Sequence, residues 1–191
     1  MSFVELDNNF KLPKGFNPDD LNHLRIYKHK YGQEMELNPT ELYWTEYQPF
    51  QPGDGTISFA RKLHLKYPEV AVHVRDYMQG LFPNITFEIE RVNLLKTVGS
   101  IRRHMDESSR KCCINIGIMN STGAITKSST TRNHEEYLAN AKEYQCQDNH
   151  AYLLDTSRLH QVVALNDNPR YLFTYGFGID FEIILENYQK S

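Results

Sequence analysis

A chain of 191 residues with a formal net charge of -3 is long enough to fold as one domain, residues 1–191, that buries about 70% of the surface its unfolded chain exposes. The chain lacks the excess of basic residues that is typical of nucleic-acid-binding domains. Its apolar runs are shorter than the roughly 18 residues with which a helix crosses a membrane. The three cysteines form no disulfide framework and the first residues lack the features of a signal peptide, so we expect a protein of the reducing cytoplasm.

The N-terminal part of the chain, residues 1–84, is predicted to carry two helices. Asn17 and Pro18 are typical of a helix cap and first turn, and apolar residues then recur at helical spacing to Tyr31. Residues 68–81 show a clearer apolar stripe at three- and four-residue spacing. A helix with one apolar face has to bury it, so we expect these helices to pack on one sheet.

Between these helices, residues 33–55 are rich in proline, glycine and aromatic residues, among them Tyr43, Trp44 and Tyr47. Such a composition predicts irregular backbone rather than regular structure. The aromatic side chains pack onto the core in the simpler interpretation. In the alternative interpretation they form a wall of a substrate site.

From residue 85 onward the pattern changes to short runs of β-branched and aromatic residues separated by turn signals. The predicted strands are 85–95, 100–106, 111–119, 124–129, 151–155, 159–165 and 170–178. Helices followed by a series of short strands predict a mainly β (α+β) fold. We expect a double-stranded β-helix, that is, a jelly-roll barrel, over about residues 85–180, with the N-terminal helices packed on one of its sheets.

One further helix is expected inside the strand-rich region. Asn133 offers a helix cap, Glu136 follows three residues later, and good helix formers continue beyond it. The segment 133–145 has two interpretations: a lid over the mouth of the barrel, or a surface helix without a role in the site.

His104 and Asp106 lie two residues apart in a predicted strand, where alternate side chains share a face. Both can therefore bind one metal ion, and His160, from another apolar strand, can supply a third ligand. Two imidazoles and one carboxylate are the ligand set that leaves coordination positions open on non-haem iron(II). The sequence thus predicts a metal site with these three ligands and no catalytic side chain beyond them.

Arg170 follows His160 after a turn-rich stretch. We expect the two strands to form a hairpin in which His160 pairs with Gly176, so that Arg170 and Thr174 point inward together with His160. Arg170 would then lie about 16 Å along the strands from His160. An arginine side chain and a five-carbon dicarboxylate together span that gap.

The three metal ligands and Arg170 occur in the order and spacing of the 2-oxoglutarate- and iron(II)-dependent oxygenase family, which this chain resembles. That pattern is His-x-Asp, a distal His tens of residues later, and an Arg or Lys about ten residues beyond. Residues 91–100, RVNLLKTVGS, are similar to the strand and glycine-containing turn that precede the motif in the prolyl hydroxylase and aspartyl/asparaginyl hydroxylase branches. The resemblance covers residues 87–177.

The resemblance implies an oxidoreductase with iron(II) as its metal and 2-oxoglutarate and dioxygen as co-substrates. Arg170 would bind the distal carboxylate of 2-oxoglutarate, since a guanidinium pairs with a carboxylate through two hydrogen bonds and an ammonium does so less well. The implied dioxygenase hydroxylates a C–H bond of its substrate and releases succinate and carbon dioxide.

Two asparagines are further candidates for contacts to 2-oxoglutarate. Asn93 lies where the resembled families place a polar contact to the co-substrate, in some relatives a Tyr or Ser. Asn115 lies in an apolar strand, where an unpaired amide costs about 1–3 kcal/mol. It needs either the co-substrate or a hydrogen bond in the barrel wall. Cys113 shares its face and is expected to pack rather than react.

The substrate is expected to be a Pro, Asp or Asn side chain of a protein or peptide, as the resembled branches imply. A free amino acid or other small molecule is the alternative within the same chemistry. A zinc hydrolase could use the same three ligands, but it would give Arg170 no role. A non-enzymatic, cupin-like binding module would need none of the ligands. The sequence leaves the oligomeric state open.

Overall fold

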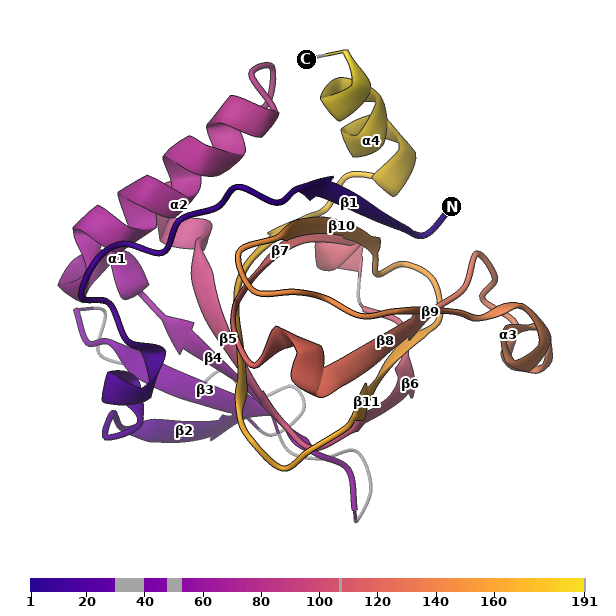
Figure 1. Cartoon of the computed structure of the whole chain (residues 1–191), viewed down its shortest axis with the longest axis horizontal. Helices are drawn as coiled ribbons and strands as arrows, with labels where there is room; N and C mark the ends of the chain where they lie inside the picture. The colour runs from indigo at the N-terminus through magenta and orange to yellow at the C-terminus, as the bar shows by residue number, and fades with distance from the viewer. Residues whose placement is uncertain (30–39, 48–52, 107, 191) are drawn as a thin grey trace.

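The computed structural model describes residues 1–29, 40–47, 53–106 and 108–190, and its strands form two sheets that enclose a common interior (Figure 1). The larger sheet consists of β1 (Phe3–Asp7), β2 (Ile26–His29), β3 (Tyr43–Tyr47), β4 (Thr56–Arg61), β5 (Asn93–Val98), β7 (Cys112–Met119), β10 (Ala151–Asp155) and β12 (Arg170–Phe177). The smaller sheet consists of β6 (Ile101–His104), β8 (Ala124–Ser128), β9 (Lys142–Tyr144) and β11 (His160–Ala164).

The strand order is β1-β10-β7-β12-β5-β4-β3-β2 in the larger sheet and β6-β11-β8-β9 in the smaller one. This mainly β, jelly-roll-like arrangement is the predicted fold class. The predicted barrel is not closed, because no hydrogen-bonded ladder joins the two sheets in the described residues. The least accurate of the strand predictions is 85–95, since β5 begins only at Asn93, after a 3-10 turn at Ile89–Arg91.

The register of the larger sheet brings polar side chains onto its interior face. β5 and β12 pair antiparallel, with Asn93 opposite Thr174 and Thr97 opposite Arg170. β7 lies on the other side of β12, with Asn115 opposite Thr174. Paired residues share a face and successive residues alternate between faces. These five side chains therefore line one surface, although they come from three strands.

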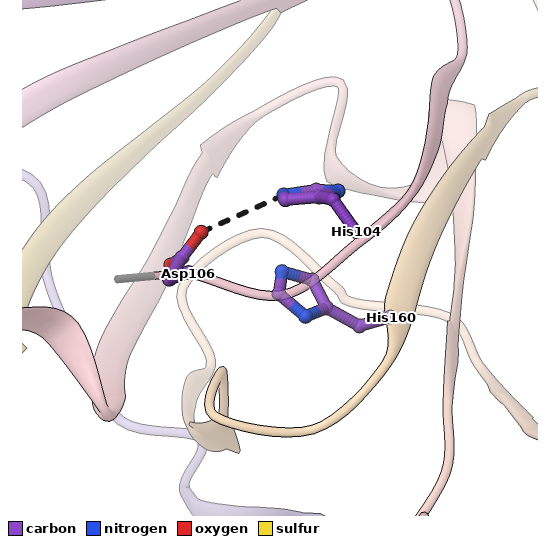
Figure 2. Close-up of side chains that lie close together, drawn as sticks. All are labelled: His104, Asp106 and His160. Carbon is purple, nitrogen blue, oxygen red and sulfur yellow. Dashed lines mark ion pairs between the residues drawn. The ribbon is translucent and has the colours of Figure 1, made fainter. Parts of the chain in front are cut away.

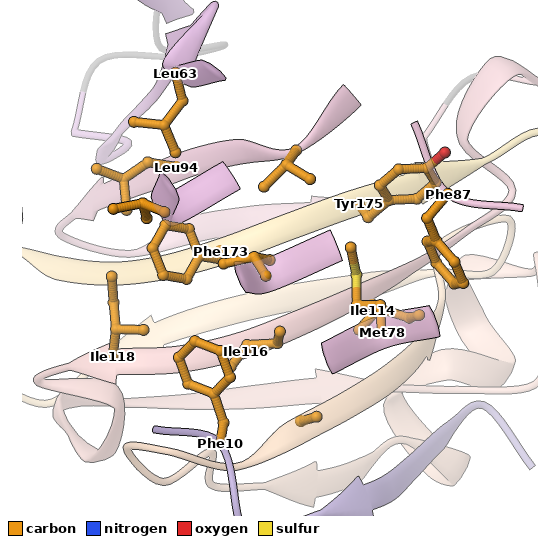
Figure 3. Packing of buried hydrophobic residues seen from close by; sticks show 14 of the residues in the cluster. Phe10, Leu63, Met78, Phe87, Leu94, Ile114, Ile116, Ile118, Phe173 and Tyr175 are labelled. Carbon is orange, nitrogen blue, oxygen red and sulfur yellow. The ribbon is translucent and has the colours of Figure 1, made fainter. Parts of the chain in front are cut away.

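The opposite face of the larger sheet is apolar and carries the core (Figure 3). Met78 of α2 (Pro68–Leu81) belongs to the same buried cluster as Ile114 of β7 and Phe173 of β12. The helix predicted over residues 68–81 is thus present with those bounds. Val70, Val74 and Met78 of its apolar stripe are buried in this cluster, and the removal of apolar surface from water is the dominant favourable term in folding.

Two other helices were not predicted. The short α1 (Leu63–Lys66) precedes α2, and α4 (Phe181–Gln189) follows β12 as the last element. Phe181 and Ile184 of α4 are buried in the core cluster that α2 also joins. Of the helices in the described ranges, none is both long and apolar enough to cross a membrane.

The predicted helix over residues 17–31 is wrong beyond its first turn. Asn17 does act as a cap, accepting a backbone hydrogen bond at the start of a 3-10 helix, Pro18–Leu21. The chain then extends into β2, which pairs in parallel with β3, while positions 30 and 31 lie outside the described residues. Strand pairing satisfies the backbone groups of this segment, and that gain outweighs a short helical periodicity.

The aromatic segment that was predicted as loop contains β3. Trp44 is 3% exposed, and its indole Nε1 donates a hydrogen bond to the carbonyl oxygen of Leu21 at 2.8 Å. Trp44 therefore packs in the core and is no substrate wall. Tyr47 points to the other face of β3 and is half-buried, and positions 48–52 lie outside the described residues.

The predicted hairpin between His160 and Arg170 does not form. β11 pairs with β6 and β8, and His160 lies opposite His104 instead of Gly176. β12 belongs to the other sheet, where Arg170 lies opposite Thr97. The connecting loop crosses from one sheet to the other. Its turn residues indicate only that the chain bends, and the choice of sheet depends on the strands that the core brings near.

The helix inserted among the strands is shorter than expected. Asn133 caps α3 (His134–Asn140), with its Oδ1 accepting hydrogen bonds from the backbone N–H groups of Glu135 and Glu136. The chain then continues as β9, which pairs with β8 and extends the smaller sheet. Pairing of β9 ends the helix early. A role of α3 as a lid stays a prediction.

Candidate metal centre

The three predicted metal ligands lie together at one end of the interior. β6 ends at His104 and β11 begins at His160, and the two residues are direct cross-strand partners. Their ring centroids are 4.3 Å apart, and His104 Nε2 lies 3.6 Å from Asp106 Oδ1. One ligand atom from each residue falls within 4.8 Å of the other two. Figure 2 shows the two rings and the carboxylate converging on one space.

Both histidines are oriented by the backbone carbonyl group two residues before them, in β6 for His104 and in the turn before β11 for His160. His104 Nδ1 lies 2.8 Å from the carbonyl oxygen of Arg102, and His160 Nδ1 lies 2.9 Å from that of Arg158. A carbonyl only accepts, so each Nδ1 carries the proton and donates. Each Nε2 then presents its lone pair to the shared space. This is how metal-binding histidines are commonly held.

His160 is 5% exposed, which fits a ligand that has to be neutral to bind a metal. Burial, together with the neighbouring His104 ring, lowers the pKa of His160 to about 4. Its imidazole is therefore uncharged at neutral pH.

Asp106 is held by two contacts that position its carboxylate. Its backbone N–H donates to the carbonyl oxygen of Thr156 at 2.9 Å. Arg110 Nη1 donates to Asp106 Oδ2 at 2.6 Å, so that Oδ1 faces His104. Burial opposes the charged form of Asp106, but Arg110 and the two histidines outweigh it and hold the pKa of this carboxyl below its usual value.

Arg110 was missed by the sequence reasoning. Its Nη2 also donates to Thr174 Oγ1 at 3.0 Å, so it links Asp106 to the interior face of β12. The one sequence signal was the spacing of four residues between an acid and a base, which usually marks a surface ion pair. Nothing local indicates that both groups turn inward.

Arg170 lies on the same interior face of β12 as Thr174, four residues away. It is 5% exposed, and its Nε and Nη1 atoms have no hydrogen-bond partner in the described residues. Burial lowers the pKa of the guanidinium. A buried charged donor without an acceptor is costly, and a carboxylate is the ligand that would relieve that cost.

The two candidate asparagines differ in their surroundings. Asn93 begins β5, where Nδ2 donates to the carbonyl oxygen of Arg91 at 2.9 Å and Oδ1 accepts from Arg61 Nη1 at 3.4 Å. Asn115 lies deeper, and its buried Oδ1 has no partner in the described residues. Their contact with a co-substrate stays a prediction.

The three cysteines, Cys112, Cys113 and Cys146, are all free and buried. Burial raises the thiol pKa of each, that of Cys146 to about 11. The reactive form of cysteine is the thiolate. Burial therefore disfavours the reactive form of all three, and packing as the role of Cys113 stays a prediction.

No family model and no curated protein matches this chain. Similar solved structures include an oxidoreductase of the 2OG-Fe(II) oxygenase family from Burkholderia pseudomallei, with 10% identity, 71% of this chain and 73% of that chain covered, and a TM-score of 0.48. A Pseudomonas putida prolyl-4-hydroxylase has 12% identity, 68% and 76% coverage, and a TM-score of 0.36.

The ribosomal oxygenase YcfD from Escherichia coli, in complex with cobalt and succinic acid, has 10% identity and a TM-score of 0.41. The match covers 67% of this chain but only 33% of that longer one. With identities of 10–12% and TM-scores below 0.5, these similarities do not show the function of this chain.

Proposed function

We propose that this protein is a 2-oxoglutarate- and iron(II)-dependent dioxygenase that hydroxylates a Pro, Asp or Asn side chain of a protein or peptide. One observation carries the proposal: a His-Asp-His cluster and a buried arginine with unpartnered nitrogen atoms share one interior. The first feature suits a metal ion and the second suits a dicarboxylate co-substrate.

His104, Asp106 and His160 would hold the metal. Two neutral imidazoles and one carboxylate oxygen bind iron(II) and leave positions open for other ligands. When bound, iron(II) with 2-oxoglutarate and dioxygen would supply the oxidising chemistry and release succinate and carbon dioxide. The protein fixes the ring orientations through backbone carbonyls and the carboxylate through Arg110.

Arg170 would bind the distal carboxylate of 2-oxoglutarate. Arg170 lies four positions before Thr174, which touches Arg110 beside the metal ligands. That spacing corresponds to about 13 Å of strand. An arginine side chain and a five-carbon diacid together span such a distance. The carboxylate would supply the acceptor that Nε and Nη1 lack.

A zinc hydrolase is less well supported by this arrangement. It could use the same three ligands, but hydrolysis gives no reason to bury an unpaired guanidinium behind the metal site. The cost of burying that charge is on the order of 1–3 kcal/mol, and only a bound anion would offset it.

The test is co-substrate turnover. The protein is loaded with iron(II) and 2-oxoglutarate without oxygen and then aerated, and succinate and carbon dioxide are measured. We expect slow release of both without a substrate, and no release from His104→Ala. His23→Ala changes an exposed histidine outside the cluster and should behave like the wild type. Hydrolysis that depends on zinc, or no metal binding at all, would contradict the proposal.

The substrate class is tested with the same readout. Succinate release is compared for peptides that contain Pro, Asp or Asn and for the free amino acids. We expect peptides to stimulate turnover. Stimulation by free amino acids alone would overturn the peptide substrate and leave the metal and co-substrate assignments in place.

A further inference from the structure

Arg61 is an interior cation that the proposed chemistry does not use. It ends β4, next to β5 in the larger sheet (Figure 1). Its Nη2 donates to the hydroxyl oxygen of Tyr47 at 3.0 Å, and its Nη1 donates to Asn93 Oδ1 at 3.4 Å. Both partners are neutral. Among the described residues, no carboxylate lies within ion-pair distance of Arg61.

The contacts of Arg61 place it at the metal end of the interior. Its guanidinium carbon lies 5.0 Å from the ring centroid of Phe59, and that of Arg110 lies 5.9 Å from the same centroid. Arg110 binds the metal-ligand carboxylate of Asp106. Arg61 and Arg110 therefore flank one aromatic ring beside the metal cluster.

Arg61 is also separated from Arg170. Its partner Asn93 lies opposite Thr174, whereas Arg170 lies opposite Thr97, four residues further along β5. The two arginines thus mark opposite ends of the interior face. A five-carbon diacid held by Arg170 at one end and the metal ligands at the other would therefore leave Arg61 unoccupied.

Arg110 is paired with Asp106, whereas Arg61 is partly buried and has no acidic partner among the described residues. An arginine has five N–H donors in a planar arrangement that matches a carboxylate. Two of them have partners in the described residues, Asn93 Oδ1 and the hydroxyl oxygen of Tyr47.

We propose that the substrate carries a carboxylate group and that Arg61 is the residue that selects it, with Tyr47 and Asn93 beside it. The reaction performed on that substrate rests on the proposed function, but the binding of the carboxylate does not. Asn93, expected from the family resemblance to contact the co-substrate, is thereby placed on the substrate side. The carboxylate is either an acidic side chain of a peptide or the terminal group of a small molecule.

The experiment compares ligands that differ in charge alone. Full-length protein with iron(II) and 2-oxoglutarate is kept without oxygen, so that binding occurs without turnover. Calorimetry measures the affinity for a decapeptide pool rich in Asp and Glu and for the same pool with Asn and Gln in their place. Free glutamate and glutamine form a second pair that separates a small-molecule source from a peptide source.

We expect the wild type to prefer one acidic ligand to its amide. Arg61→Gln should reduce that preference by about tenfold or more, the effect of losing a charged hydrogen-bond donor. Arg61→Lys should restore part of it and also serves if the Gln variant folds poorly. Arg75→Gln changes an arginine on the outer helix α2, paired there with Asp76, and should retain the full preference.

Three results would overturn the inference: no preference for either acidic ligand, a preference that survives in Arg61→Gln, or a rise in the KM for 2-oxoglutarate larger than the loss of acidic-ligand affinity. The last result would make Arg61 a co-substrate ligand. Failure of the proposed function looks different. Succinate would then be missing on aeration, while binding of the acidic ligand that depends on Arg61 would still be measured.

Discussion

Two arginines in the interior have opposite surroundings. At the metal end, Arg110 donates to Asp106 Oδ2 and to Thr174 Oγ1. At the other end, Arg170 has two guanidinium nitrogen atoms without a partner in the described residues. A guanidinium that is paired by the protein helps to shape a site. One that is buried without a partner indicates a place for a ligand, because an unpaired buried charge only destabilises the fold.

The largest effect is expected from removing one of the three metal ligands. Ala in place of His104, Asp106 or His160 should abolish iron binding and turnover, since two remaining ligands hold a metal ion poorly. Metal content after dialysis and succinate release measure the two effects, and circular dichroism checks the fold. Full activity in any one of these variants would show that the ligand set is wrong.

The next largest effect concerns Arg170. Loss of a charged pair costs about 2–5 kcal/mol, so Arg170→Ala should raise the KM for 2-oxoglutarate sharply. Arg170→Lys should recover part of the loss. An unchanged KM in both variants would place the co-substrate elsewhere.

A measurement of the free energy of unfolding tests the role of Arg170 without any turnover. Arg170→Met removes a buried unpaired charge but keeps most of the volume, so the free energy of unfolding without ligand should rise by about 1–3 kcal/mol. Thermal unfolding should also show that 2-oxoglutarate stabilises the wild type and no longer stabilises this variant. A less stable Arg170→Met protein would mean that the guanidinium has partners in the fold.

A smaller effect is expected for Arg110, which acts on the metal through Asp106. Removal of a group that orients a metal ligand costs about 10- to 100-fold in metal affinity. Arg110→Gln should weaken iron binding by that factor, and added iron should restore turnover. A change in the KM for 2-oxoglutarate as large as the loss of iron affinity would indicate that Arg110 contacts the co-substrate. Arg110 and Arg170 would then have the same role.

The smallest effect is expected for Thr174→Val, which keeps the shape and removes one hydrogen bond to Arg110. Such a bond contributes about 1 kcal/mol, so iron affinity should fall only a few-fold. A loss as large as that of Arg110→Gln would show that Thr174, and not Asp106, sets the position of the guanidinium.

The sequence by itself determined the features that depend on local geometry. The spacing of two residues keeps His104 and Asp106 close together, although the predicted strand 100–106 ends at His104 and Asp106 lies beyond β6. The apolar stripe of residues 68–81 produces α2. The series of strands after residue 85 followed from short β-branched runs and turns. These patterns repeat over two to four residues, so neighbours in the chain decide them.

Only the tertiary structure decided which strands meet. His160 pairs with His104 rather than with Gly176, and Arg170 lies in the other sheet. Arg61 turns toward the metal end because residues 56–61, for which no element was predicted, extend the larger sheet beside β5. Such pairings depend on the burial of both faces of a strand by distant segments. The direction in which Arg61, Arg110 and Arg170 point follows from those pairings, because a local pattern carries no information about the partner strand.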